Sequence, residues 1–345
     1  MKQVNEYETL HSHTTESDGK LTHAQVLDTC QEYGIRIVAF TDHDVVIPKH
    51  TLASLQQTNH PTQWISGIEI SSGLPKEMGG GTTSMLHIVG LFVDPTNNEL
   101  QNHCQKAQEA RIVRMQKIVA NLQGLGFDIS QEDCLAASGG EAVGRPHIVQ
   151  ALTDKNTNME IIRSLAQKML KDSNNNPELK EKYDRMVAEK DEKRYPYTLF
   201  LTPESYIQEV YVEYMYWTDL DTSVQLIRNA GGVAILAHWI TIVNKLDEGF
   251  IDKLFAEGRL DGAETIFGLW TKFEGTWDQT EEYIKTLTQL VNKHKKLSSG
   301  GADAHTTEDF QEFSFNSWYA DRTIGLTQNI IQNSHVDTRW SSLLK

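Results

Sequence analysis

Cysteine is scarce in this chain of 345 residues. The three cysteines, Cys30, Cys104 and Cys134, form no Cys-x-x-Cys pair and leave an odd number, so neither a disulfide framework nor a thiolate zinc site is expected. Free thiols fit a reducing compartment, and the sequence therefore predicts a cytoplasmic protein.

Long apolar runs are also missing. No segment approaches the roughly 18 apolar residues that a membrane-spanning helix needs. The N-terminal segment does not combine a charged start with an apolar stretch, as a secretory signal does. We therefore predict a soluble protein with no membrane partner.

Basic residues are outnumbered. The chain has 32 Lys and Arg against 47 Asp and Glu, a formal net charge of −15. This excess of negative charge argues against binding of nucleic-acid duplexes without sequence preference, which requires a basic face. Small phosphorylated substrates stay compatible, because bound divalent cations make an acidic pocket attractive to anions.

Motifs for a covalent nucleophile are absent as well. The sequence contains no Gly-x-Ser-x-Gly, and its cysteines have no obvious histidine partner. Serine and cysteine hydrolases of the common types are therefore not expected.

The pattern that is present alternates short strands with amphipathic helices. Thr22 is suited to cap a helix that ends at Gly34, and the β-branched run 35–40 then predicts a strand. Such alternation predicts an α/β barrel or an open parallel sheet. The other expected strands are 8–13, 64–69, 85–90, 233–237, 262–266 and a last one before Gly300.

The alternation stops in the middle of the chain. Helices are expected at 99–123, 131–137 and 147–170, with no strand between them. The charged segment 171–194 fits a solvated helix with a flexible loop, and a moving lid is the alternative. The expected organisation is a first part of the barrel at 1–96, a helical insertion at 97–220, a second part of the barrel at 221–310, and a C-terminal tail packed on the body at 311–345.

Histidines and carboxylates gather at the ends of the expected strands. His11 and His13 are two residues apart, so on a strand both imidazoles point to one face and reach one ion. Asp303 and His305 repeat this spacing. His87 alone would be a core residue, but together with the others it becomes a candidate ligand. The candidate metal ligands are His11, His13, Asp18, His43, Glu69, His87, His238, Asp303 and His305.

Nitrogen and oxygen donors without thiolate suit zinc, manganese or iron. Two or three such ions held close together lower the pKa of a bound water and neutralise charge on a phosphate. The donor set therefore predicts metal-assisted hydrolysis, with a phosphate ester as the favoured substrate. The histidines outside it are expected at the surface: His23, His50, His60, His103, His294 and His335.

Successive short motifs resemble those of the PHP (polymerase and histidinol phosphatase) family, and in particular its stand-alone bacterial phosphoesterases. The resemblance runs in order from about residue 8 to about residue 305. Its motifs are His11-Ser-His13, Ser17-Asp18-Gly19, Thr41-Asp42-His43-Asp44, Gly67-Ile-Glu69-Ile-Ser71, His87, Gly144-Arg145-Pro146-His147, Ala230-Gly-Gly-Val-Ala-Ile-Leu-Ala-His238 and Gly301-Ala-Asp303-Ala-His305.

This resemblance implies a distorted (β/α)7 barrel with a mainly helical insertion and a trinuclear metal site. It assigns one ion to His11, His13, Glu69 and Asp303, a second to Glu69, His87 and His238, and a third to Asp18, His43 and His305. It also implies that Arg145 and His147 face the substrate phosphate. For His147 a structural role at the start of a helix after Pro146 is the alternative.

The chain departs from the family pattern at Trp239, which follows His238 where proline is common, and at Ala302. Trp239 is a candidate stacking surface in the pocket wall. The implied reaction is attack by metal-bound hydroxide, with Arg145 stabilising charge and either His238 or a metal-bound water protonating the leaving oxygen.

Three functions are compatible with the sequence. The favoured one is a phosphomonoesterase acting on a small nucleotide or a similar metabolite. The second is a 5′–3′ exonuclease on short oligonucleotides. In that case Trp239 would stack on a base, and Arg111, Arg114 and Arg145 would contact the phosphates of the nucleic acid. The third is a non-catalytic metal-binding module, which is disfavoured because every ligand position is filled. The sequence does not indicate an oligomeric state.

Overall fold

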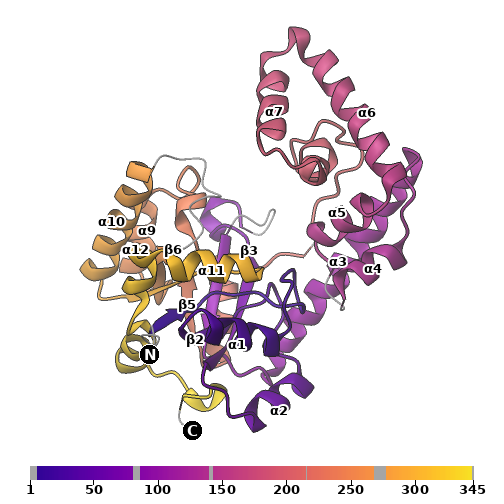
Figure 1. The fold of residues 1–345 in the computed structure, drawn as a ribbon. Coiled ribbons are helices and arrows are strands. Elements are labelled where there is room, and N and C mark those ends of the chain that lie inside the picture. Colours follow the sequence, from indigo (N-terminus) through magenta and orange to yellow (C-terminus); the bar gives the residue numbers. More distant parts are fainter. Residues whose placement is uncertain (1–5, 81–85, 140–142, 215, 268–276, 344–345) are drawn as a thin grey trace. The chain divides into compact units, whose positions relative to one another are not determined.

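The computed structural model describes residues 6–80, 86–139, 143–214, 216–267 and 277–343, with the side chains of 277–279 left out. The chain divides into two compact units (Figure 1). Unit 1 comprises residues 1–106 and 217–345, and unit 2 comprises residues 107–216.

Unit 1 is built on a sheet of seven strands that follow one another in chain order. The strands are short and largely buried, as expected for β-branched runs covered by helices. They are β1 (Tyr7–Thr9), β2 (Ile35–Phe40), β3 (Gln63–Ser72), β4 (Leu86–Leu91), β5 (Val233–Leu236), β6 (Gly262–Phe267) and β7 (Leu297–Gly301).

One strand breaks the parallel pattern. Strand β4 runs antiparallel to both β3 and β5, whereas the other neighbours are parallel. A parallel neighbour requires a crossover of a dozen or more residues, usually a helix. Between β3 and β4 the described residues form only the 3₁₀ turn η1 (Lys76–Met78), so the chain reverses direction there. The expectation of a wholly parallel sheet was wrong at this strand.

The first and last strands meet beyond the end of β1. The Leu10 N–H donates to the Gly300 carbonyl at 3.0 Å, and the Asp303 N–H donates to the His11 carbonyl at 3.1 Å. Ser12 and Ala304 form a parallel bridge. These bonds bring β1 and β7 together as in a barrel, and the predicted α/β class with seven strands is confirmed.

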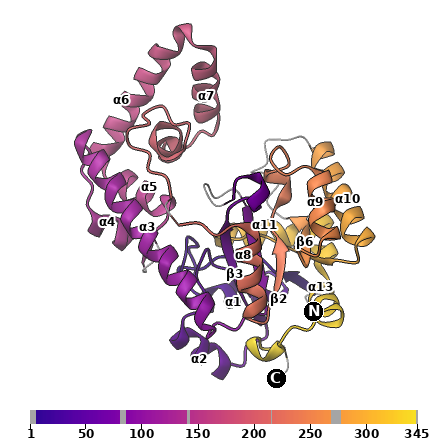
Figure 2. The ribbon, with the colours of Figure 1, turned by 180° about the vertical axis from the view of Figure 1, so that it is seen from behind.

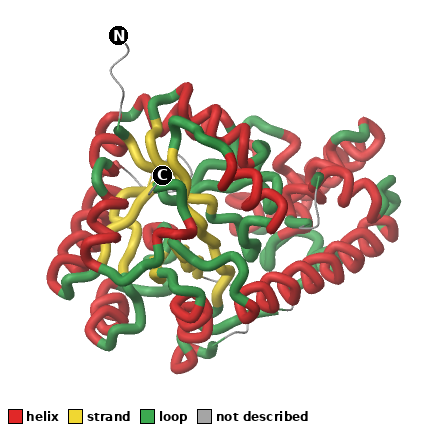
Figure 3. The backbone as a smooth tube through the Cα atoms, turned by 90° about the horizontal axis from the view of Figure 1, so that it is seen from below, coloured by secondary structure: helices red, strands yellow, loops and turns green. Residues whose placement is uncertain are grey.

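Helices surround the strands of unit 1 (Figure 3). Thr22 caps α1 as predicted, because its hydroxyl accepts the Gln25 N–H, and Gly34 follows the helix with φ of 72°. Helix α8 packs on β4, β5 and β3 (Figure 2). Gly90 in β4 leaves room for the Ile227 side chain of this helix. The helices of unit 1 are α1 (His23–Glu32), α2 (Lys49–Gln57), α8 (Leu220–Asn229), α9 (Glu248–Ala256), α10 (Trp277–Lys293), α11 (Thr307–Phe315), α12 (Ser317–Ala320) and α13 (Leu326–Asn333).

The C-terminal helices contribute to the core of unit 1. Phe310, Phe313 and Tyr319 are buried in one cluster with residues of α1 and β2, such as Cys30 and Phe40. Burial of large aromatic side chains is a major source of stability in a domain of this kind. All three cysteines of the chain are buried and free.

Unit 2 is helical and has a hydrophobic core of its own. Its helices are α3 (Asn98–Gly124), which begins in unit 1, α4 (Gln131–Ser138), α5 (Arg145–Thr153), α6 (Asn156–Asp172) and α7 (Pro177–Ala188). Its shorter turns are η2 (Ser173–Asn175), η3 (Glu192–Arg194) and the π-helical η4 (Tyr197–Leu201).

One prediction for unit 2 needs correction. The segment 147–170 is not one helix, because Lys155 adopts an extended conformation and the Asn158 amide donates to the Leu152 carbonyl at the break. The charged segment 171–194 contains a helix as expected, α7, with the turns η2 and η3 on either side of it. Within the described parts of the chain, no helix is long and apolar enough to cross a membrane.

Candidate metal centre

The two spaced pairs of predicted ligands lie side by side. Strand β1 ends at Thr9, so His11 and His13 follow the strand and do not lie in it, contrary to the prediction. Their backbone is held in an extended arrangement by pairing with the segment after β7, in which the His13 N–H donates to the Ala304 carbonyl at 2.8 Å. Asp303 and His305 flank Ala304. Backbone pairing between segments nearly 300 residues apart therefore builds one wall of the site.

A second wall comes from β3 and the turn after β2. Glu69 lies in β3, and His43 forms a parallel bridge with it. The Glu69 N–H donates to the Asp42 carbonyl at 3.0 Å, and the Asp44 N–H donates to the Glu69 carbonyl at 2.9 Å. These bonds fix the His43 backbone beside the Glu69 backbone.

The third wall comes from the antiparallel strand. His87 lies within β4, and His238 follows β5. The Ala237 N–H donates to the His87 carbonyl at 3.0 Å. Nδ1 of His87 and Nε2 of His238 are 3.2 Å apart. The turn of the chain at β4 thus delivers a histidine from inside a strand to the site.

Glu69 is the centre of the arrangement. Its side chain is fully buried, and its two oxygens each face imidazole nitrogens. The Oε1 atom lies 3.3 Å from His11 Nε2, 3.0 Å from His87 Nδ1 and 3.0 Å from His238 Nε2, and the Oε2 atom lies 3.4 Å from His13 Nε2 and 2.8 Å from His43 Nδ1.

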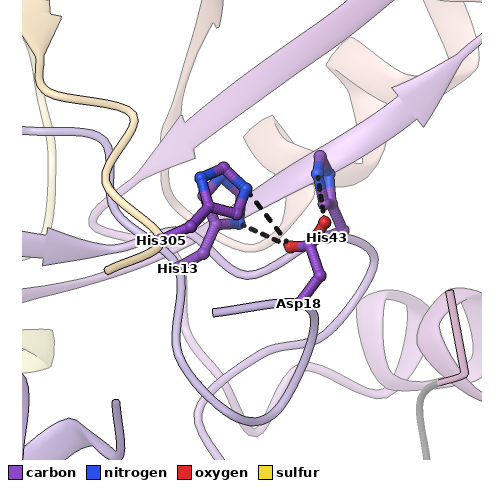
Figure 4. Close-up of side chains that lie close together, drawn as sticks. All are labelled: His13, Asp18, His43 and His305. Atoms are coloured by element: carbon purple, nitrogen blue, oxygen red, sulfur yellow. Dashed lines mark ion pairs between the residues drawn. The ribbon is translucent and has the colours of Figure 1, made fainter. Parts of the chain in front are cut away.

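Asp303 and Asp18 complete the set on either side of His13. The Asp303 Oδ1 atom is 3.1 Å from His13 Nε2 and 3.5 Å from His11 Nε2. Figure 4 shows His13 and His305 approaching Asp18 from one side and His43 from the other. The Asp18 carboxylate is 3.4 Å from His305 Nε2, 3.8 Å from His13 Nδ1 and 3.9 Å from His43 Nε2.

All nine predicted ligands therefore lie in one connected cluster in unit 1. Three overlapping groups have one donor atom each within 4.8 Å of the others, which is close enough for a shared ion. The groups are His13, Asp18, His43 and His305; His11, His13 and Glu69; and His43, Glu69 and His87. They overlap the three predicted ligand sets but are not identical to them.

The carboxylates of the cluster are strongly held in the charged form. Burial acts to raise the pKa of Glu69, but the surrounding imidazoles, led by His87 and His43, bring it well below the ordinary value. Burial opposes ionisation of Asp18 too, and His43 and His305 lower its pKa well below the usual range. Anionic carboxylates are the form that binds a cation.

The imidazoles differ from one another. Burial, reinforced by His305 and His43, lowers the pKa of His13 to about 4. Burial also lowers the pKa of His87. Burial acts to lower the pKa of His11 as well, but the neighbouring carboxylates, led by Glu264, raise this pKa well above the ordinary value. His13 and His87 are therefore neutral near pH 7, as an imidazole ligand must be.

The chemistry of the cluster fits divalent cations. The Oδ1 atom of Asp18 and the Oε2 atom of Glu69 are buried and form no well-aligned hydrogen bond within the described residues, although imidazole nitrogens lie 3.4 and 2.8 Å from them. Buried carboxylate oxygens normally accept hydrogen bonds, so these two are suited to a cation. Nε2 atoms of His11 and His13 lie 3.2 Å apart, with both rings aimed at the same space. Converging donors of this kind suit zinc, manganese or iron.

The sequence did not reveal one buried carboxylate beside the cluster. Glu264 in β6 lies 2.8 Å from His11 Nδ1 and accepts the His238 N–H at 2.8 Å. It therefore orients one candidate ligand by its ring and another by its backbone, which is the role of outer carboxylates around metal sites. Glu264 lies in the middle of β6 and belongs to none of the motifs of the family resemblance. The only sign of it in the sequence is an acidic residue within a largely apolar strand.

The backbone is unusual where three of the ligand-bearing segments turn. His238, Asp303 and Asp44 have φ of 29°, 50° and 54°. Residues other than glycine avoid this region, and such conformations persist where the surrounding structure holds them. They mark the turns that aim side chains into the cluster.

The predicted phosphate-binding residues are in different situations. Arg145, in unit 2, is exposed, and its Nη1 donates to the Leu201 carbonyl at 3.2 Å. His147 is 2% exposed, and its Nδ1 accepts the Gly144 N–H at 3.0 Å. This bond caps the start of α5, so the structural alternative for His147 is supported.

Trp239 does not form a stacking surface. It is 2% exposed, lies in the main core of unit 1, and donates its Nε1–H to the Leu246 carbonyl at 2.6 Å. The prediction of a ring in the pocket wall was wrong, because the turn η5 (Trp239–Thr241) directs this side chain into the core.

Two histidines expected at the surface are also buried. His23 is 4% exposed and packs edge-on against Phe40, and His103 is 3% exposed beside Asp44. Both histidines lie on helices, on the face that contacts the barrel. The helical periodicity of the sequence did not distinguish these inward positions from exposed ones.

Several curated proteins are similar to this chain, although no family model matches it. It is 26% identical over 302 residues to the 3′,5′-nucleoside bisphosphate phosphatase of Chromobacterium violaceum, covering 86% of each chain. It is 26% identical to the 5′-3′ exoribonuclease of Haemophilus influenzae, covering 86% of this chain and 89% of the relative. It is 23% identical to the phosphoribosyl 1,2-cyclic phosphate 1,2-diphosphodiesterase of Eggerthella lenta, covering 86% and 94%.

Solved structures share the fold. An amidohydrolase of Chromobacterium violaceum superposes with a TM-score of 0.59 at 22% identity, covering 87% of this chain and 88% of its own. A candidate metal-dependent phosphoesterase of Bifidobacterium adolescentis has the same TM-score, identity and coverage. At this identity the likeness concerns the fold.

Proposed function

We propose that this protein is a metal-dependent phosphoesterase of the PHP family, and that its substrate is a phosphomonoester of a small nucleotide or a similar metabolite. The predicted resemblance and the hydrolase class are confirmed by relatives named as a phosphatase, an exoribonuclease and a phosphodiesterase. The observation that carries the reaction type is the convergence of nine nitrogen and oxygen donors around Glu69.

Two or three divalent cations are part of the proposal. When bound, they would supply charge neutralisation for the phosphate and a lowered pKa for an attacking water. Glu69 would hold adjacent ions at a fixed spacing, because each of its oxygens faces a different set of imidazoles. Asp18 and Asp303 would hold ions on either side of His13. Zinc, manganese and iron all suit these donors.

His238 is proposed both as a ligand and as a source of the proton for the leaving oxygen. Its side chain is partly accessible, 14% exposed, whereas those of His11 and His13 are fully buried. Burial opposes the charged form, but the Glu69 carboxylate raises the pKa of His238. His238 therefore combines partial exposure with a raised pKa, two properties that it shares with His305.

Arg145 is proposed to bind a phosphate group of the substrate. Its guanidinium is exposed, and the contact with the Leu201 carbonyl uses one of its five N–H donors. Burial, and after it the charge of Arg145, lowers the pKa of Arg114 to about 10, so the charges of these two arginines influence each other. Arginines held close together attract a polyanion. His147 has no part in this proposal, since its Nδ1 serves the helix cap.

An exonuclease acting on short oligonucleotides is the second candidate. The exoribonuclease relative favours it, and Arg111 and Arg114 in unit 2 offer further positive charge. It loses the stacking surface that the sequence suggested, because Trp239 is buried. A small phosphomonoester is therefore the preferred substrate.

Elemental analysis combined with a hydrolysis panel tests the proposal. The purified protein is assayed with nitrophenyl phosphate, mononucleotides, nucleoside bisphosphates and short RNA oligomers, before and after chelation. We expect two or three bound divalent ions per chain and phosphate release from the small esters that chelation abolishes. Metal-free protein with full activity, or metal-loaded protein inert across the panel, would contradict it, and the latter would support a non-catalytic module.

The substrate classes separate in the same panel. Faster turnover of oligomers than of mononucleotides would favour the exonuclease, and the reverse would favour the phosphomonoesterase. Asp18→Ala and His43→Ala serve as controls, since both should lose activity while the far-UV circular dichroism spectrum is kept. A cytoplasmic location stays a prediction from the three free cysteines.

A further inference from the structure

The turn that bears His43 is fastened to β3 on both sides of the histidine. The Glu69 N–H donates to the carbonyl of Asp42, and the N–H of Asp44 donates to the carbonyl of Glu69. The side chain of Asp44 adds a third bond, in which its Oδ1 accepts the Ser71 N–H at 2.8 Å. The positions of His43 and Glu69 relative to each other therefore depend on Asp44.

Asp44 does this from an unfavourable backbone conformation. Its φ is 54°, in the left-handed region, and its side chain is 2% exposed. A buried carboxylate that makes a structural bond from such a turn needs a polar neighbour, because burial of an isolated charge is costly. That neighbour comes from outside the motif.

His103 is the neighbour. It lies on α3, about 60 residues further along the chain, and its Nε2 is 3.5 Å from the Asp44 Oδ1. Both side chains are 2% exposed. Cys104, the next residue, is also buried, and burial, followed by the charge of Asp44, raises its pKa to about 12. The start of α3 thus places a buried imidazole beside the Asp44 carboxylate.

We infer that His103 is a positioning residue for the metal centre, acting through Asp44 on the turn that carries His43. The inference rests on the proposed function. His103 is not one of the nine candidate ligands, and its ion pair is with Asp44, which is not one of them either. It belongs to no motif of the resemblance, and its place on a helix made it look like a surface residue.

Outer partners of this kind tune a metal site by fixing the orientation of its ligands. Removal of the His103 ring would take away a polar neighbour of the buried Asp44 carboxylate and loosen the turn that holds His43 against Glu69. Binding of the ions that use these two donors should weaken, whereas the donors themselves would remain.

The test compares His103→Ala and His103→Gln with His294→Ala and His294→Gln in the full-length protein. His294 also faces an aspartate, with its Nε2 2.6 Å from Asp252 Oδ1, but it follows α10, and Asp252 lies on α9, so neither residue is in a segment that bears a candidate ligand. The readouts are the dissociation constant for Mn²⁺ by competition with a chromophoric chelator, the visible spectrum of the Co²⁺ form, and kcat and KM separately.

We expect His103→Ala to bind Mn²⁺ about 10 to 100 times more weakly than the wild type. His103→Gln should recover part of this loss, because its amide still offers an N–H donor to Asp44. The His294 variants should match the wild type. A His103→Ala protein that folds and binds Mn²⁺ like the wild type would overturn the inference.

A double-mutant cycle separates positioning from general destabilisation. In a His43→Ala background the turn no longer presents a ligand, so the further change His103→Ala should have little effect on Mn²⁺ affinity. An equal loss in both backgrounds would also overturn the inference. Wild-type protein that neither binds metal nor hydrolyses phosphate esters would instead end the proposed function, so the two failures are distinguishable.

Discussion

The two units of this protein present functional residues in different ways. In unit 1 the candidate ligands come from seven separated segments, and strand pairing brings them within hydrogen-bonding distance of one another. In unit 2 the two residues predicted to face the substrate phosphate, Arg145 and His147, belong to one short motif at the start of one helix. A sheet assembles a site from distant parts of the chain, whereas a helix start distributes adjacent residues to different faces.

The outcome for unit 2 shows this distribution. His147 turns inward and caps α5, while Arg145 stays exposed. Adjacent positions in one motif therefore have different roles. The following predictions examine the contrast between the two units, beginning with the largest expected effect.

Glu69→Gln should have the strongest effect, because it removes the negative charge that faces five imidazoles of unit 1. We expect activity and metal affinity to fall more than about 100-fold. Roughly 100-fold is the largest loss that is typical when a residue hydrogen-bonded to a metal ligand is mutated. Metal content and kcat/KM measure the change, with Glu257→Gln on the surface as the control. Activity within tenfold of the wild type would show that Glu69 is not central to the site.

Glu264→Gln tests whether the outer carboxylate matters nearly as much as the ligands. The amide keeps the size of the side chain but removes the charge beside His11, so metal affinity should fall by about 10 to 100 times. Metal competition titration measures this change. If the affinity were unchanged, the orientation of His11 would have to come from packing alone.

Arg145→Ala should act on substrate binding and leave the metal centre intact. We expect KM to rise about tenfold, since a hydrogen bond to a charged group contributes roughly 1.5 to 3 kcal/mol. Metal content should not change. Arg163→Ala, which removes another exposed arginine of unit 2 that is paired with Glu192, is the matched control. Equal KM values for both variants would exclude a phosphate contact by Arg145.

His147→Ala should have the smallest effect on catalysis and act mainly on stability. Loss of the cap leaves the Gly144 N–H without its partner, which costs about 1 to 3 kcal/mol of the free energy of unfolding. Urea unfolding of the full-length protein measures it. A loss of kcat without loss of stability would restore the phosphate-binding role that the resemblance implies.

The sequence identified the candidate ligands that converge in the structure, because their types and spacing carry chemistry that depends little on the surroundings. His11 and His13 were identified from a two-residue spacing, and they converge even though β1 ends before them. The spacing was informative because the pairing with the Asp303 segment continues the strand geometry past the last regular residue.

Residues whose role depends on burial were harder to predict. Trp239, Glu264 and His103 all occupy positions whose exposure is decided by packing between remote segments. Trp239 was assigned to a pocket wall from its neighbour in sequence, yet a short turn sends it into the core. No local pattern marked the role of Glu264, because its partners His11 and His238 lie in remote segments that follow other strands.

By itself, the sequence determined the α/β class, the helical middle of the chain and the identity of the nine donors, because periodicity and ligand chemistry are properties of short segments. The tertiary structure alone decided that β4 runs antiparallel, that Glu69 lies between five imidazoles, and that His147 and Trp239 face inward. These features depend on contacts between residues far apart in the chain, and such contacts form only when the segments pack.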